Sequence, residues 1–304
     1  MINTRTSLFF LILFALSMPI FGQSAGTSAA SSAGGSKYLP LTEVREGMKG
    51  TAMTVFRGSE PEEFDVEILG VLPGGVGPNQ DLIIGRIGGG LANRTAVFAG
   101  MSGSPVYVNG KLIGAISYSF PFSKEAICGI TPIEQMISIF EERPRSTTEN
   151  REPVPVSFAE IASATYEMRL PQQMPASSPV VAAGSGSMLQ AVAGQSFRRI
   201  GTPLTFTGIA QSTLDLFAPQ LMQAGLIPVA AAGGSAKITP MKKADANTLK
   251  GGASVSMMLT RGDYSLAAAG TVTMRDGDKV YAFGHPFLSL GTSDLTMSES
   301  SVIT

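Results

Sequence analysis

The sequence has very few of the residues that build metal sites and disulfides. Its 304 residues include one cysteine, Cys128, and one histidine, His285. A single cysteine excludes a disulfide within the chain, so packing has to stabilise the fold. One cysteine and one histidine also exclude a zinc site built from these two residue types, although a metal site made only of carboxylates stays open. We therefore expect no metal and no cofactor.

Charged residues are also scarce. They make up 15% of the chain, the formal net charge is -1, and lysine and arginine are scattered along the sequence. Proteins that bind nucleic acids usually carry a basic patch or stripe. The sequence therefore gives no indication of a nucleic-acid partner.

Residues 1–22 have the pattern of a secretory signal peptide. Arg5 supplies a positive charge, and the apolar run at 8–21 is too short to span a bilayer comfortably. We expect a cleaved signal and export to the periplasm or the extracellular space; an uncleaved N-terminal anchor is the alternative. No later run is apolar enough for a membrane helix, so no membrane span is expected in the mature chain. Residues 23–36 are almost entirely Ser, Ala and Gly and predict a flexible tether.

Short strand-like runs follow the tether and predict a mainly β first domain over residues 37–142. The runs are rich in β-branched residues or alternate between apolar and polar residues. Turns are expected at 73–75 and 88–90, and Asn109-Gly110 between two runs predicts a hairpin. Several short strands at this spacing are typical of a barrel or a sandwich. The expected strands are 52–56, 64–72, 81–87, 105–108 and 111–119.

A helix is expected to close the first domain at residues 131–142. Thr131 can cap its N-terminus, Pro132 fits the first turn, and Glu134 completes a capping box. Ile133, Met136, Ile137 and Phe140 fall at helical spacing on one face.

The rest of the chain predicts a linker and a second β domain. Residues 143–176 are rich in charge and proline and are expected to connect the domains, with a short helix at 158–169. The second domain, 177–304, should contain a helix at 212–224 ended by Gly225, although Pro219 is expected to kink or split it. A loop is expected at 229–237. The expected strands are 203–209, 253–260, 264–274 and 279–283, with Asp276-Gly277 in the last hairpin turn.

Residues 100–105, Gly-Met-Ser-Gly-Ser-Pro, place a serine on a glycine-flanked bend between two predicted strands. Such a bend exposes Ser102 as a nucleophile, and the backbone amides of Gly100 and Ser102 could stabilise an oxyanion. The alternative is an ordinary tight turn at the rim of a barrel. Ser104 is a less suitable nucleophile because Pro105 restricts its backbone.

His285 is the one imidazole that the chain could use to activate Ser102. It follows the last predicted strand and lies between Gly284 and Pro286 in an apolar setting, which suits a partly desolvated general base. A structural histidine at the end of a strand is the alternative.

Two segments resemble the SpoIVB-type serine peptidases. Residues 100–115 are similar to the nucleophile segment of that family, and residues 270–273 with 282–285 are similar to its histidine segment. The first segment is also similar to the GDSGGP signature of trypsin-type enzymes. The resemblance implies a trypsin-like double β-barrel in two halves, with Ser102 as nucleophile, His285 as general base, and Gly100 and Ser102 as oxyanion donors. Because the histidine segment follows the serine segment, we expect a permuted domain, or two halves that belong to separate repeats. Because the sequence stops about twenty residues after His285, a C-terminally truncated member is also expected.

The carboxylate that would orient the histidine is less well defined. The stretch from 85 to 100 contains no acidic residue. Asp81 is the first candidate, and Asp294 and Asp263 are the alternatives. The resemblance therefore predicts an exported serine endopeptidase that cleaves itself or an envelope protein, with a protein or peptide as substrate. A catalytically inactive barrel protein that binds a peptide or envelope partner is the alternative.

Overall fold

The computed structural model describes residues 36–121, 123–141, 177–180, 189–231, 244–287 and 293–303. The expected signal peptide, tether, linker and linker helix lie outside these residues. The boundaries of the two expected domains stay predictions.

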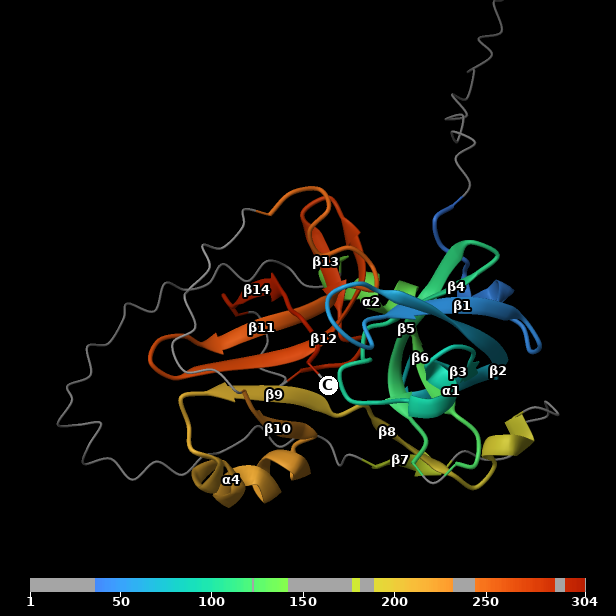
Figure 1. Ribbon diagram of the computed structural model, residues 1–304. Coiled ribbons are helices and arrows are strands. Elements are labelled where there is room, and N and C mark those ends of the chain that lie inside the picture. The colour runs from blue at the N-terminus through green and yellow to red at the C-terminus, as the bar shows by residue number, and fades with distance from the viewer. Residues whose placement is uncertain are drawn as a thin grey trace, which may run out of the picture. The chain divides into compact units, whose positions relative to one another are not determined.

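Six strands close into an antiparallel barrel (Figure 1). Their order in the sheet is β4-β1-β2-β3-β6-β5, and β5 pairs with β4 to complete the ring. Closure leaves no strand of the ring with an unpaired edge. β7 (Ser177–Val180) and β8 (Ser196–Arg199) extend this sheet from β5. The barrel strands are β1 (Lys49–Thr54), β2 (Glu62–Gly77), β3 (Gln80–Gly88), β4 (Pro105–Val108), β5 (Lys111–Ser119) and β6 (Ile127–Pro132).

A second sheet is formed by later parts of the chain, drawn in yellow to red in Figure 1. β9 and β10 are parallel and are connected through the helix α4, whereas the other pairs are antiparallel. The described strands of this sheet are, in spatial order, β10 (Leu226–Ala230), β9 (Thr202–Thr207), β12 (Ser265–Asp276), β11 (Ser254–Thr260) and β14 (Thr296–Glu299), with β13 (Lys279–Ala282) also paired to β12. A mainly β fold made of a barrel and a second sheet confirms the predicted fold class.

Helices are few in the described residues. α2 (Ile133–Glu141) packs on the barrel, α4 (Gln211–Gln223) joins β9 to β10, and α1 (Ala92–Thr95) is a single turn. Short 3₁₀ helices lie at Leu41–Glu43 and Leu189–Val192. None of these helices is long and apolar enough to cross a membrane.

Several local predictions are confirmed. Asn109 and Gly110 have φ values of 51° and 72°, as a type I′ hairpin between β4 and β5 requires. Gly225 follows α4 with a φ of 76°, which is the usual conformation just after a helix. α4 runs through Pro219 without interruption, so the expected split does not occur.

Three local predictions are wrong. Thr131 and Pro132 belong to β6 and not to a helix, because Thr131 pairs with Ala115 of β5 and its hydroxyl bonds Ser117 at 2.6 Å. The expected turn at 73–75 lies within β2, since the strand continues through a register shift to Gly77. The start of the expected loop at 229–237 belongs to β10, which pairs with β9.

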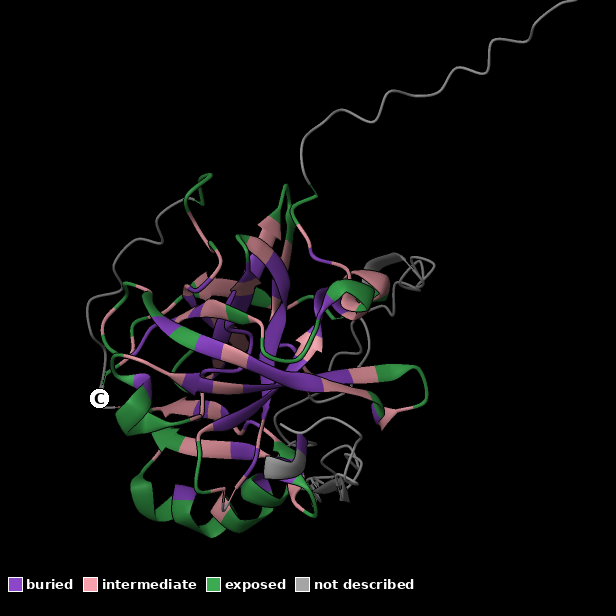
Figure 2. Cartoon of the chain, turned by 90° about the vertical axis from the view of Figure 1, so that its right-hand side faces the viewer, coloured by how far each residue is buried: buried purple, intermediate pink, exposed green. Residues whose placement is uncertain are grey.

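Buried residues, purple in Figure 2, lie mostly in the strands. Those of β5 connect the barrel to the second sheet. Ile113 and Ile116 belong to the barrel core. Leu112 and Ala115 belong to another cluster, which they share with α2 residues and with Met274 and Tyr281 of the second sheet. Because β5 has apolar neighbours on both sides, nearly all of its residues are buried. The loop before β4 therefore lies close to the second sheet.

Candidate active site

The bend that carries Ser102 depends on two glycines with positive φ. Gly100 has a φ of 95° and Gly103 a φ of 99°, a region that other residues rarely adopt. A Cβ atom on Gly103 would overlap the carbonyl oxygen of Thr271 and lie 2.5 Å from the amide nitrogen of Phe283. Glycine is therefore needed at position 103 both for its conformation and because the histidine segment passes close to it.

Ser102 is completely buried, and its hydroxyl has no hydrogen-bond partner among the described residues. The amide of Gly103 donates to the carbonyl of Ile116 at 2.8 Å. Within the described part of the chain, by contrast, the amides of Gly100 and Ser102 donate no hydrogen bond. These two amides are therefore available to donate to another group, which is one requirement of an oxyanion hole. The neighbouring Ser104 donates its hydroxyl to Met101 at 2.6 Å and is already engaged.

Two threonines of β12 hold the backbone of this bend. The Thr273 hydroxyl donates to the carbonyl of Gly103 at 2.7 Å, and the Thr271 hydroxyl donates to that of Gly100 at 2.9 Å. The amide of Thr271 also donates to the carbonyl of Ser102 at 2.8 Å. The sequence reasoning missed these roles. The sequence did contain a signal for them. Thr271 and Thr273 occupy alternate positions of a mostly apolar strand, so their side chains point to the same face of the sheet.

His285 follows a tight turn at the end of β13. Phe283 and Gly284 both have left-handed φ values, 65° and 68°, and for an aromatic residue this conformation is strained. The ring of Phe283 fits because position 270 is glycine: a Cβ there would lie 2.5 Å from it. Phe283 also stacks on Phe287 at a centroid distance of 5.9 Å. The strained turn is thus fixed by packing on both sides of the histidine.

The ring of His285 is held in one tautomer. Its Nδ1 lies 3.1 Å from the carbonyl oxygen of Pro286. Because a carbonyl oxygen can only accept, the proton of the neutral ring is on Nδ1, and Nε2 carries the free lone pair. Nε2 is buried and has no partner in the described residues. The pKa of His285 is lowered to about 4, mainly by burial; the Pro286 carbonyl opposes this effect, the charge of Arg199 adds to it, and the Ile200 carbonyl has the smallest, opposing effect.

The segment that carries Ser102 and the segment that carries His285 meet at Thr271 and at β5. The amide of Phe283 donates to the carbonyl of Thr271 at 3.2 Å, and the amide of Thr271 donates to the carbonyl of Ser102. On the β5 side, Gly284 lies against Ala115 and Ser117, and Ile116 between them accepts the bond from Gly103. Ser102 and His285 are not hydrogen-bonded to each other, since neither Oγ nor Nε2 has a partner. The structure therefore joins the two segments and leaves Ser102 Oγ and His285 Nε2 without a hydrogen-bond partner among the described residues.

The candidate carboxylates lie elsewhere. Asp81 is half-buried at the start of β3, where it accepts a hydrogen bond from the Gly74 amide at 2.8 Å. Asp263 and Asp294 are exposed. The groups that shift the pKa of His285 include no carboxylate. In the described residues, then, the Pro286 carbonyl and not an acid contacts Nδ1.

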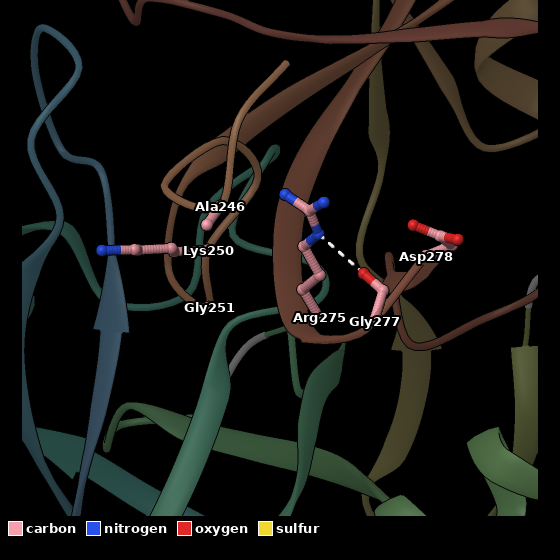
Figure 3. A pocket seen from close by; sticks show the side chains of 6 residues that line it. All are labelled: Ala246, Lys250, Gly251, Arg275, Gly277 and Asp278. Carbon is pink, nitrogen blue, oxygen red and sulfur yellow. Dashed lines mark hydrogen bonds between the residues drawn. The ribbon is translucent and has the colours of Figure 1, made fainter.

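Two pockets lie near these segments. A cavity of about 20 Å³ is lined by residues from three segments, among them Arg199, Thr202, Leu226 and His285. A larger, open pocket of about 460 Å³ is lined by Lys250, Arg275 and Asp278 together with small residues (Figure 3). Neither Ser102 nor His285 lines the larger pocket. No group of three metal-ligating side chains occurs in the part of the chain that the structure describes.

One stretch of the chain matches a known protein family. Residues 12–137 match the model of the family SpoIVB peptidase S55. The match covers less than half of the chain, including the barrel strands and the Ser102 segment, and it supports the family resemblance predicted from the sequence. No match was found among curated proteins or among solved structures.

Proposed function

We propose that this chain, whose residues 12–137 match the model of the family SpoIVB peptidase S55, is an exported serine endopeptidase that cleaves itself or an envelope protein through an acyl-enzyme. One observation carries the proposal. Ser102 Oγ and His285 Nε2 are both buried without a partner, at the ends of two segments that are joined through Thr271. An unpaired buried polar group costs about 1–3 kcal/mol, so two of them in sequence-distant segments that are joined through Thr271 need a functional explanation.

The chemistry follows from the tautomer of the histidine. Nε2 accepts the proton of the Ser102 hydroxyl while Oγ attacks the carbonyl carbon of the scissile peptide. The amides of Gly100 and Ser102 donate to the oxyanion of the tetrahedral intermediate. The imidazolium then gives its proton to the leaving amine as the carbon–nitrogen bond breaks. A water molecule, deprotonated by the same Nε2, hydrolyses the ester and restores Ser102.

The imidazolium needs an acceptor at Nδ1 while it exists. The Pro286 carbonyl at 3.1 Å fills this place and fixes the ring orientation. A carbonyl dipole stabilises the imidazolium less than a carboxylate does, so a Ser-His pair of this kind should be slower than a full triad. Asp81 stays the predicted carboxylate, although its Oδ1 accepts a hydrogen bond from Gly74 and it is not among the groups that shift the pKa of His285.

Substrate entry requires a movement, because Ser102 is 0% exposed. Pro203 of β9 lies within 3.6 Å of the position that a Cβ on Gly100 would occupy, so the start of β9 helps to cover the bend. Slow, restricted cleavage of one protein fits a covered nucleophile better than broad digestion does.

Labelling with a fluorophosphonate probe tests the proposal. The purified protein lacking residues 1–22 should be labelled at Ser102, located by mass spectrometry of the modified peptide. Ser102→Ala and His285→Ala should abolish labelling, whereas Ser104→Ala should keep it, because Ser104 is engaged with Met101. A folded protein that stays unlabelled up to the onset of thermal unfolding would refute the peptidase function.

Such a result would favour a barrel protein that binds a peptide or envelope partner without cleaving it. The observation that favours this alternative is that no carboxylate among the described residues acts on His285. Export rests on Arg5 and the apolar run that follows it. It is tested by sequencing the N-terminus of the protein recovered from the envelope fraction.

A further inference from the structure

We propose that Arg199 forms a subsite that binds a carboxylate side chain of the substrate next to the scissile bond. The proposal rests on the peptidase function proposed above and adds a substrate preference to it. Arg199 is the last residue of β8. It was not among the residues that the sequence singled out.

Arg199 and His285 border the same small cavity. Together with Thr202, Pro286 and Phe287 they line its wall. The position of Arg199 is fixed by β8, which pairs with β5 at Tyr118, and by the next residue, Ile200, whose amide donates to Ser117 at 3.0 Å. Ser117 belongs to the part of β5 that also contacts Gly284. The backbone of Arg199 is therefore anchored to the same strand as the histidine turn.

The charge of Arg199 is not neutralised by the described residues. The ion pairs found there belong to Arg86, with Glu67 and Glu125. The side chain of Arg199 instead donates a hydrogen bond to the neutral hydroxyl of Tyr118, which is buried. Arg199 itself is half-buried. A half-buried guanidinium without a counter-ion is a suitable binding group for a carboxylate.

The position beside the general base gives the subsite a catalytic consequence. When His285 takes the proton from Ser102, the imidazolium is repelled by the positive charge of Arg199. A substrate carboxylate on Arg199 removes this repulsion at the moment when the charge develops. The other residues that line the cavity are uncharged. An acidic substrate residue should therefore raise kcat as well as lower KM, whereas a simple binding site would mainly lower KM.

The test uses the protein without residues 1–22 and a library of peptides made by digesting a proteome. Cleavage products are identified by mass spectrometry. We expect Asp and Glu to be enriched about five- to tenfold within two or three positions of the cleaved bonds, as estimated for a half-buried ion pair. Arg199→Gln should remove the enrichment, and Arg199→Lys should retain most of it. Arg198→Gln, which removes an exposed arginine from the adjacent position, is the matched control and should behave as the wild type.

Two matched peptides, with Glu or Gln at the enriched position, then separate kcat from KM. Arg199→Gln should cleave the Gln peptide faster than the wild type does, because the repulsion is gone, and the Glu peptide more slowly. If Arg199→Gln cleaves the Glu and Gln peptides with the same ratio of rates as the wild type, the subsite is overturned and the peptidase function stands. Failure of the wild type to react with both the peptides and the fluorophosphonate would overturn the peptidase function itself.

Discussion

Replacing Thr273 by valine tests whether β12 holds the Ser102 bend. Valine has nearly the shape of threonine but cannot donate the 2.7 Å hydrogen bond to the Gly103 carbonyl. Thr273 is 0% exposed, so water cannot replace the lost donor. A buried acceptor left without its partner costs about 1–3 kcal/mol of unfolding free energy. Thr273→Ser is the matched control, since it keeps the donor and loses one methyl group, at a cost of about 1 kcal/mol.

The two variants should differ more in reactivity than in stability. The Gly103 carbonyl belongs to the residue next to Ser102. When it loses the hydrogen bond to Thr273, the orientation of Ser102 is no longer fixed. We expect the rate of fluorophosphonate labelling to fall about tenfold or more in Thr273→Val and less than threefold in Thr273→Ser, since small misplacements of reacting groups have large effects on rate. Stability is measured by urea unfolding followed by far-UV circular dichroism, because the chain has no tryptophan to report by fluorescence. Equal labelling rates in both variants would refute the positioning role of Thr273.

Three further predictions follow from other buried groups. Gly103→Ala should prevent accumulation of folded protein in a soluble-expression assay, because its Cβ would overlap the Thr271 carbonyl; a folded variant with wild-type melting temperature would contradict the close approach. The pKa of His285 lies at about 4 in the fold against an ordinary 6.5, so the unfolded chain binds more protons between these values. The contribution of His285 to the free energy of unfolding should therefore be fully present above about pH 6.5 and fall toward pH 4 by at most about 3 kcal/mol, and by less if solvent reaches the ring. The melting temperature of His285→Gln should depend less on pH across this range than that of the wild type. Burial raises the pKa of the Cys128 thiol to about 12, so a disulfide reagent at pH 8 should modify it in urea and not in the native protein.

Local features of the structure could be predicted from the sequence alone. Asn109-Gly110 fixes its hairpin because both residues tolerate positive φ, a property that does not depend on distant neighbours. The same holds for Gly225 after α4. Ser102 and His285 could be singled out because one lies on a glycine-flanked bend and the other is the one histidine of the chain.

Contacts between distant segments were decided by the tertiary structure. Thr271 bonds Gly100 across 171 positions of sequence, and that contact exists only because β12 passes the barrel in one register. The hydroxyl of Thr131 bonds Ser117 in the barrel, and no helix begins there, since pairing with β5 outweighs local capping chemistry. The charge of Arg199 beside His285 has the same origin, because β8 adds to β5 at that point. Composition and spacing thus determine which residues are able to do chemistry, whereas strand order and register decide which of them meet.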